Sequence, residues 1–301
     1  MTKLLAAEAP IKPPNAFQPK KALVLFNAKA GHVVDADGDK LIAALTELGV
    51  EQCTMVGPEK LDKKLLQRAK RFDVVIVLGG DGTARSVAEL APRDGPPLIL
   101  LPGGTLNILP HALYGDIAWP DALKAAFERG APMHLPFGRA NGHAFYIAAI
   151  FGAPTLLARA REAVREGHYL TALRRLRHAA ARMFSHKIHG RAGEKKRFSK
   201  VDALGVLLPS YSGELAGEGL EWVRLNTDGL ADLARVGLRG LSDAWRDDAS
   251  IRIDVTKSGE IKSTGIIPAT LDGEPHTFLG HVKITYERCG PNVIAVKTPL
   301  D

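Results

Sequence analysis

The amino-acid sequence predicts an α/β protein in two parts: an N-terminal three-layer α/β domain with a parallel sheet, and a C-terminal antiparallel β-sandwich domain. Up to residue 133, apolar strand-like runs alternate strictly with helical patterns, which favours a parallel sheet covered by helices on both faces. After residue 133, short strand-like runs are separated by turn residues, as in antiparallel sandwiches. A chain of 301 residues is also long enough to divide into two cores.

In the first part, each strand is expected to lead into a helix. The runs 72–78 and 97–102 are apolar on both faces, which is typical of strands buried between two helical layers. The pattern at 38–49 has apolar residues at helical spacing and ends at Gly49. The expected strands are 22–27, 51–56, 72–78 and 97–102, and the expected helices are 38–49, 59–71, 83–90, 105–113 and 119–130.

In the second part, Asn141-Gly142 lies between two strand-like runs and predicts a hairpin. Further strand-like runs follow at 201–209, 221–226, 230–238, 250–256, 263–287 and 292–299. The expected organisation is a flexible tail at 1–20, the α/β domain at 21–133 with 290–301 as candidates to complete it, and the sandwich at 134–289 with a basic helical insertion at 157–200.

Composition narrows the classes of protein. The two cysteines form no disulfide framework, which suits a reducing cytosol. The apolar run near the N-terminus is too short for a signal sequence, and no later run reaches the roughly 18 apolar residues of a membrane span. We therefore expect a cytoplasmic protein.

The net charge of +7 is concentrated in one segment, 159–200, which has thirteen Lys or Arg against three Glu. Apolar residues are interspersed among these cations, and such segments bind anionic membrane surfaces. The alternative is a solvated basic face. No nucleic-acid-binding module is visible and aromatic residues are scarce there, so no nucleic-acid partner is expected. We expect peripheral association with the inner face of a membrane.

Gly79-Gly80-Asp81-Gly82-Thr83 stands where a buried strand meets a helix. Open α/β sheets bind ligands at this edge, glycines let a phosphate approach the backbone, and free N–H groups attract anions. A carboxylate would repel phosphate directly, so Asp81 suits a Mg²⁺ ion that bridges phosphate oxygens. The alternative is a glycine turn in which Asp81 caps the helix.

Two other loops follow strands in the same way, at 102–107 (PGGTLN) and at 27–31 (NAKAG). Glycine-rich junctions at one sheet edge can together hold a nucleotide, although each alone can be a simple turn. The P-loop pattern G-x-x-x-x-G-K-[ST] is absent from the sequence.

Two late turns carry carboxylates. Asp272-Gly273 is first of all a hairpin turn; the alternative is that Asp272 and Glu274 point into an interdomain cleft, where one accepts a proton from a hydroxyl. Asp228 is either the cap of a turn or an oxygen ligand of a hard cation.

Taken together, these motifs make the chain resemble the diacylglycerol kinase catalytic-domain family, especially bacterial soluble lipid kinases, with sphingosine kinases as relatives. The most specific element is GGDGT followed about twenty residues later by P-x-G-T-x-N; DG-x-x-D-L at 228–233 and DGE at 272–274 support it. The resemblance implies an α/β nucleotide domain, a β-sandwich domain, and transfer of the γ-phosphoryl of ATP, with Mg²⁺, to the hydroxyl of a lipid substrate.

The resemblance also implies roles for individual residues. Glu274 falls at the proton acceptor of bacterial members, with Asp272 beside it, and Asp81 is the rival base by the sphingosine kinase pattern. Asp228, with the carbonyls of Leu225 and Leu230, falls on a structural Mg²⁺ site. The implied nucleotide contacts are Asn27, Gly31, Gly79, Gly80, Asp81, Gly82, Thr83, Gly104, Thr105 and Asn107.

The sequence departs from the family pattern at a few positions. Arg85-Ser86 stand where the family often has Asn-Glu, and Ile108 stands where an acid often follows Asn107. Two alternatives therefore remain beside the lipid kinase: a soluble-alcohol kinase similar to NAD kinases, and a catalytically degenerate regulator that binds nucleotide or lipid.

Overall fold

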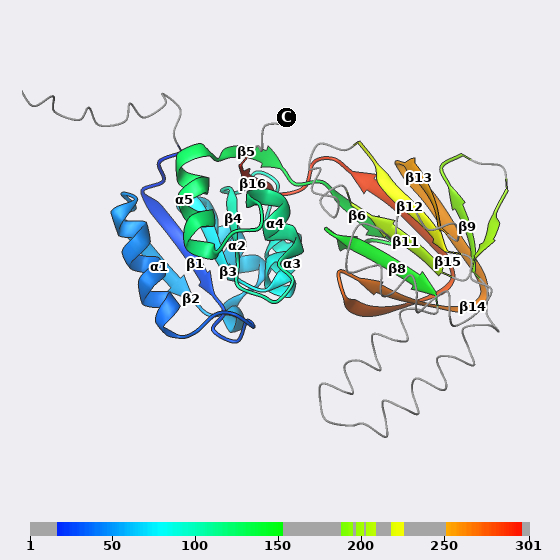
Figure 1. The fold of residues 1–301 in the computed structure, drawn as a ribbon, viewed down its shortest axis with the longest axis horizontal. Coiled ribbons are helices and arrows are strands. Elements are labelled where there is room, and N and C mark those ends of the chain that lie inside the picture. The colour runs from blue at the N-terminus through cyan, green and yellow to red at the C-terminus, as the bar shows by residue number, and fades with distance from the viewer. Residues whose placement is uncertain are drawn as a thin grey trace, which may run out of the picture.

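The structure is a computed structural model that describes residues 17–152, 188–194, 197–201, 203–208, 218–225 and 251–296. Two sheets lie side by side, one carrying helices and the other built of strands alone within the described residues (Figure 1). The α/β part contains the first sheet, and the β part contains the second. The predicted fold class is confirmed.

The first sheet has the strand order β2-β1-β3-β4-β16-β5. Its strands are β1 (Lys21–Phe26), β2 (Gln52–Val56), β3 (Val74–Gly79), β4 (Leu98–Pro102), β5 (Ala131–His134) and β16 (Asn292–Ala295). The first four run parallel, β16 is parallel to β4, and β5 is antiparallel to β16 at the edge. Every residue of β3 and β4 is buried, because helices cover the sheet. The carboxyl ends of β1, β3 and β4 therefore meet at one edge.

The helices follow the strands as predicted, with two differences. They are α1 (Ala36–Glu47), α2 (Lys63–Arg68), α3 (Asp81–Leu90), α4 (Ile108–Tyr114) and α5 (Trp119–Arg129), with 3₁₀ turns at Pro58–Lys60 and Ala69–Arg71. The helix expected at 59–71 is broken, because Asp62 caps α2 by accepting a hydrogen bond from the Leu65 amide at 2.6 Å. The helix expected at 105–113 begins later, because Asn107 adopts a left-handed conformation with φ 51°.

The second sheet is antiparallel and has the order β13-β12-β11-β8-β14-β15-β6-β7, with β9 paired to β14 and β10 to β9. Its strands are β6 (Phe137–Ala140), β7 (His143–Phe145), β8 (Ala148–Gly152), β9 (Ile188–Ala192), β10 (Ser199–Val201), β11 (Ala203–Leu207), β12 (Leu220–Leu225), β13 (Ile251–Thr256), β14 (Ser258–Leu271) and β15 (Glu274–Glu287). Asn141 and Gly142 both have positive φ in the turn between β6 and β7, as the predicted hairpin requires.

The helical expectation for 157–200 is wrong at 188–192 and 199–201, which are strands. Alternate residues of β9, beginning with Ile188, are buried, and residues 189–192 pair with β14. Strand β14 is therefore the pairing partner of this part of the segment, and the composition of the segment does not indicate it. Residues 157–187 and 195–196 of the expected insertion, and the strand-like run expected at 230–238, lie outside the described residues.

Each sheet has its own hydrophobic core. The second core contains the fully buried rings of Trp222, Phe145 and Phe151. Gly259 makes room for the largest of them: a Cβ on Gly259 would lie 2.2 Å from Cζ2 of Trp222. The cores are thus fixed by side-chain shape at positions far apart in sequence.

The chain crosses between the sheets twice, and the two crossings are hydrogen-bonded to each other. The Leu135 amide donates to the Pro291 carbonyl at 2.9 Å, and the Gly290 amide donates to the Leu135 carbonyl at 3.1 Å. Figure 1 shows both crossings side by side between the sheets.

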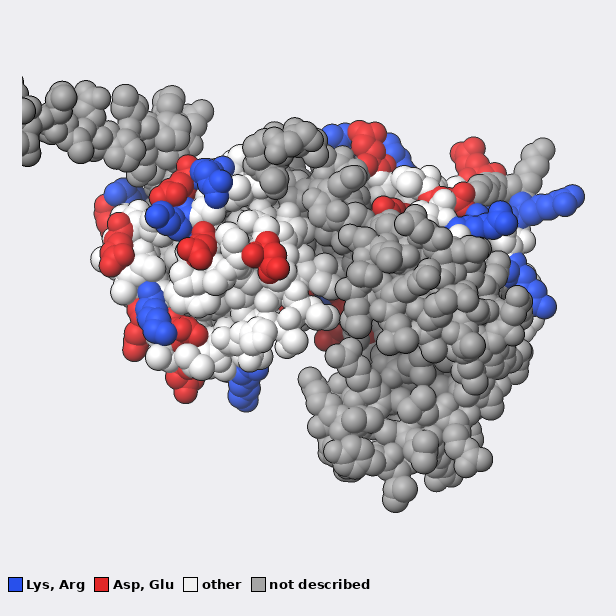
Figure 2. All heavy atoms as spheres, in the orientation of Figure 1, with Lys and Arg blue, Asp and Glu red and all other residues white. Residues whose placement is uncertain are grey.

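On the face in Figure 2, the described cations and anions of the α/β part are interspersed rather than gathered in one patch. None of the described helices has the length and apolar character that crossing a bilayer demands.

Candidate functional site

The first two strand-end loops are tied together by side chains. The Asn27 Nδ2 group donates a hydrogen bond to the Thr83 hydroxyl at 3.0 Å, and Asn27 Oδ1 accepts from the Lys29 amide at 3.1 Å. Asn27 also pairs through its backbone with the Leu78 carbonyl at 2.9 Å. Asn27 and Thr83 therefore brace the loop after β1 against the start of α3.

The loops after β3 and β4 contact each other through their backbones. The Gly103 amide donates to the Gly79 carbonyl at 2.9 Å, and a Cβ on Gly104 would lie 2.7 Å from Cα of Gly80. Gly82 differs, since a Cβ there would meet nothing within 4 Å. The glycines thus let the loops pack closely and leave the start of α3 open.

The loop after β1 also reaches the loop after β4. The His32 amide donates to the Gly103 carbonyl at 3.0 Å, and a Cβ on Gly31 would lie 2.8 Å from the Thr105 hydroxyl oxygen. Thr105 is exposed at this edge. All three predicted loops therefore meet at one edge of the first sheet.

Asn107 acts on the loop rather than facing solvent. It is buried, its Oδ1 accepts from the Gly104 amide at 2.6 Å, and its Nδ2 donates to the Gly104 carbonyl at 2.8 Å. Both ends of the side-chain amide are occupied by Gly104, so Asn107 shapes the loop from behind.

Asp81 opens α3 but does not cap it, because no side-chain cap bond is present at that terminus. Its Oδ1 accepts instead from the Leu109 amide in the first turn of α4 at 3.4 Å. Burial raises the pKa of Asp81, while the nearby backbone amides and the charge of His111 oppose the rise. Asp81 thus links the two glycine-rich loops with a partly buried carboxylate.

The β14–β15 corner is a two-residue turn at Asp272 and Gly273, both with positive φ. The Asp272 carboxylate accepts three backbone amides of the β7–β8 connection, those of Tyr146 at 2.8 Å and of Ile147 and Ala148 at 2.9 Å. Burial raises the pKa of Asp272, and these hydrogen bonds hold the rise in check. Asp272 therefore anchors the corner.

Glu274 begins β15 beside this anchor and is exposed. His276, two residues on, lies against His143 with ring centroids 5.1 Å apart. Burial lowers the pKa of His276, and the charges of His143 and Arg85 lower it further. The charge of Arg85 on α3 also acts on the carboxyl of Asp272. Tyr146, whose amide binds the Asp272 carboxylate, lines a pocket with Ala88 and Glu89 of α3, so the corner lies near this helix.

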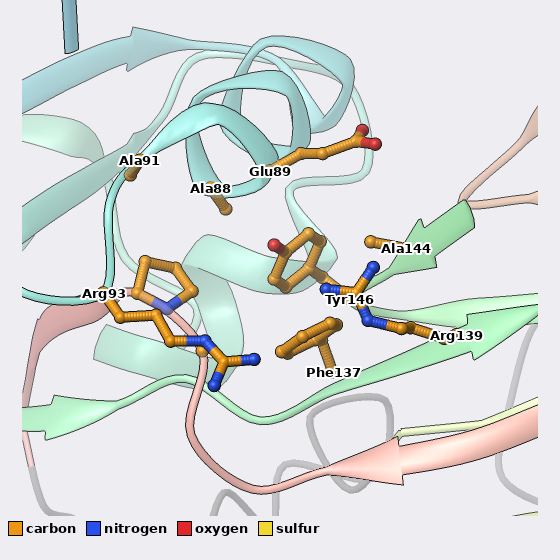
Figure 3. Close-up of a pocket in the computed structure, with 10 residues that line it drawn as sticks. Ala88, Glu89, Ala91, Arg93, Phe137, Arg139, Ala144 and Tyr146 are labelled. Carbon is orange, nitrogen blue, oxygen red and sulfur yellow. The ribbon is translucent and has the colours of Figure 1, made fainter. Parts of the chain in front are cut away.

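A pocket of about 210 Å³ lies between the last turns of α3 and the β6–β7 hairpin (Figure 3). Its lining residues are Ala88, Glu89, Ala91, Arg93, Phe137, Arg139, Ala144, Tyr146, Gly290 and Pro291. The Arg139 guanidinium lies 4.9 Å from the centre of the Phe137 ring. Both guanidinium groups already pair with Glu287, that of Arg93 at 3.8 Å and that of Arg139 at 3.9 Å, and the Glu89 side chain also lines the pocket.

The cation site implied at 225–230 falls mostly outside the described residues. Leu225 is the last residue of β12 and is buried; Asp228 and Leu230 lie beyond the described ranges. Within those ranges, no group of three or more His, Cys, Asp or Glu is arranged to hold a metal ion.

The basic segment is described only from residue 188 onward, with gaps. There Arg191 forms an ion pair with Glu260 at 2.9 Å and lies 4.8 Å from the centre of the Phe198 ring. At least one cation of the basic segment, Arg191, is therefore paired with a carboxylate of the β part.

The sequence interpretation missed two features, the buried and unpartnered Nε atom of Arg85 on α3 and the pocket at the end of that helix. The unusual Arg85-Ser86 pair after GGDGT was a signal for the first. The pocket had no signal, because its lining comes from three separate stretches of the chain.

Comparisons with known proteins agree with this geometry. The family model of the diacylglycerol kinase catalytic domain matches residues 21–143. A curated relative, the diacylglycerol kinase of Bacillus subtilis strain 168, is 39% identical over 80 residues. That alignment covers 25% of this chain and only about a quarter, 26%, of the relative.

Solved structures show the same fold over nearly the whole chain. A diacylglycerol kinase structure from Bacillus anthracis strain Sterne has a TM-score of 0.65 at 14% identity, covering 94% of this chain and 98% of its own. An NAD kinase from Archaeoglobus fulgidus in complex with ATP has a TM-score of 0.53 at 14% identity, covering 92% and 94%. At these identities the likeness concerns the fold alone.

The residues that the family model matches include all three strand-end loops of the site. The resemblance that the glycine-rich motifs predict is therefore confirmed: residues 21–143, with all three loops, match the catalytic domain of the diacylglycerol kinase family.

Proposed function

We propose that the protein is an ATP- and Mg²⁺-dependent kinase that transfers the γ-phosphoryl group to the hydroxyl of a lipid. The single observation that carries the proposal is the meeting of the loops after β1, β3 and β4 at one sheet edge. The match of residues 21–143 to the diacylglycerol kinase catalytic domain supports the lipid as the acceptor class.

The nucleotide is proposed to bind against the start of α3. Gly82 leaves this helix terminus uncovered, and backbone amides in such a position bind phosphate oxygens. Thr105, exposed on the neighbouring loop, supplies a further hydroxyl. Asn27, Thr83 and Asn107 hold the loops in place through the hydrogen bonds described above.

The residues present fit a phosphate-bound Mg²⁺ ion. Such an ion takes most of its ligands from water and phosphate and needs only one or two carboxylates. Asp81 offers one carboxylate at the loop edge, with Oδ1 turned to the Leu109 amide. When bound, the ion neutralises charge on the phosphates.

Glu274 is proposed as the proton acceptor, since the oxygens of Asp272 are already engaged by three amides. The lipid hydroxyl oxygen forms a bond to the γ-phosphorus, the bond from that phosphorus to the β–γ bridging oxygen breaks, and ADP leaves. The hydroxyl proton passes to the Glu274 carboxylate and then to solvent. Most of the rate enhancement in such reactions comes from positioning and charge stabilisation.

Membrane docking is proposed for the basic segment 159–200, so that a lipid hydroxyl can reach the corner from a bilayer. The surplus of cations there is the support, each contributing about 1 kcal/mol near an anionic surface. The protein would then work at the inner face of the membrane, and vesicle binding should weaken as salt rises.

The test is kinase activity on total lipid extract and on NAD with labelled ATP, with mass analysis of the product. A phosphorylated lipid, lost in Asp81→Asn while the far-UV circular dichroism stays unchanged, is the expected result. Transfer to NAD but not to lipid would replace the proposal with the soluble-alcohol kinase. ATP binding without transfer to any acceptor would favour the degenerate regulator.

A further inference from the structure

Arg85 lies in the second turn of α3, four residues after Asp81, and is half-buried. Its Nε atom is buried and has no hydrogen-bond partner. In the described part of the chain, no ion pair is found for this guanidinium either. A buried cationic donor without a partner costs free energy, and native proteins rarely keep one without a reason.

The neighbours of Arg85 do not provide the missing partner. Its charge acts on the carboxyl of Asp272 and on the ring of His276, both in the β part. However, Asp272 is fully engaged by backbone amides. Among the described residues, no carboxylate forms an ion pair with Arg85. The Arg85 guanidinium therefore has no anionic partner in the described part of the protein, and it suits an anionic ligand.

The position of Arg85 indicates which anion. Gly82, which marks the open terminus of α3, is three residues before it, and residues three or four apart share a helix face. Ala88 and Glu89, one turn further on, line the pocket shared with the β part. Arg85 thus lies on α3 between the open terminus, where the phosphate site is proposed, and the turn that lines this pocket.

We infer that Arg85 binds the γ-phosphate of the nucleotide, on the side that faces the acceptor hydroxyl. The inference rests on the proposed function. A guanidinium group presents a planar fork of donors that matches phosphate oxygens, and it remains charged throughout. The γ-phosphate would be the anionic partner that Arg85 lacks among the described residues. Arg85 would in turn stabilise the phosphoryl group during transfer.

The test compares two nucleotides that differ in the γ-phosphate. Calorimetry with Mg²⁺ measures the affinity of AMP-PNP and of ADP for the wild type, Arg85→Gln and Arg85→Lys. We expect Arg85→Gln to weaken AMP-PNP binding by about 10- to 100-fold while ADP binding changes by less than about twofold. Arg85→Lys should recover part of the loss, because it keeps the charge without the fork.

Arg129→Gln, which removes an exposed cation at the end of α5, is the matched control and should leave both affinities unchanged. Thermal denaturation of each variant checks that the fold is kept. Equal weakening of both nucleotides in Arg85→Gln, or of neither, would overturn the inference and leave the proposed function standing. A wild-type protein that binds neither nucleotide would overturn the proposed function itself.

Discussion

Gly80 and Gly104 touch backbone to backbone where two strands of the first sheet end, since a Cβ on Gly104 would lie only 2.7 Å from Cα of Gly80. The contact involves main-chain atoms, so no side chain can rotate away to relieve a clash. The spacing of the two glycine-rich loops is therefore set by the absence of side chains at this point.

Gly104→Ala should separate the two loops. We expect it to lower the affinity for an ATP analogue at least about tenfold and to destabilise the protein by about 1–3 kcal/mol, as overpacking does. Calorimetry and urea unfolding measure the two effects.

Gly82→Ala is the matched substitution on the neighbouring loop, where a Cβ meets nothing within 4 Å. We expect unchanged or slightly higher stability, because alanine favours helix over glycine, together with weaker ATP binding. Unchanged ATP affinity in both variants would contradict phosphate binding at these loops.

Glu274→Gln and Asp272→Ala should fail in different ways. Removing the proposed proton acceptor should lower kcat by about 10²- to 10⁴-fold without changing the midpoint of unfolding. Removing Asp272 leaves three backbone amides without their acceptor and should cost about 1–3 kcal/mol of stability. A Glu274→Gln enzyme with full kcat would exclude Glu274 as the base.

Arg85→Gln should raise the pKa of His276. Burial lowers that pKa, and the charges of His143 and Arg85 lower it further, so removing the Arg85 charge lets the imidazole bind a proton more readily. An NMR titration of the His276 ring measures the shift, with Arg129→Gln as the control. No shift would mean that α3 and the β14–β15 corner are further apart in solution.

Gly259→Ala should destabilise the β part, since the added Cβ would lie 2.2 Å from the ring of Trp222. We expect a loss of about 1–3 kcal/mol in the free energy of unfolding. Gly265→Ala, on the same strand β14, adds a Cβ with nothing within 4 Å and is the control. Equal unfolding midpoints for the two variants would contradict this packing.

Asp37 should make stability depend on pH. The Val34 amide at 3.0 Å and Lys40 at 3.1 Å hold the pKa of Asp37 below its usual range. A lowered pKa in the folded state means that the stabilisation is present above the unfolded pKa of about 3.9 and is lost as the pH falls through the folded value. The stability difference between wild type and Asp37→Asn should therefore shrink below about pH 4, as measured by urea unfolding.

Much of the fold could be predicted from local patterns. Residues 72–78 and 97–102 are apolar on both faces, and this pattern correctly predicted buried parallel strands. The same holds for the positive-φ turns at Asn141-Gly142 and Asp272-Gly273, because asparagine, aspartate and glycine tolerate that backbone.

What could not be predicted depends on partners distant in sequence. Strand β9 lies in a segment whose composition indicates a helix, and it is a strand because β14 pairs with it. Asp272 is an anchor because the β7–β8 connection, more than a hundred residues earlier, brings three amides to it. No single stretch of sequence carries that information.

The paired crossings at Leu135 and Gly290 make the β part an insertion within the α/β part, because β16 returns to the first sheet after the last strand of the second. A single cut cannot yield two self-sufficient fragments, since an N-terminal fragment would lack the strand between β4 and β5.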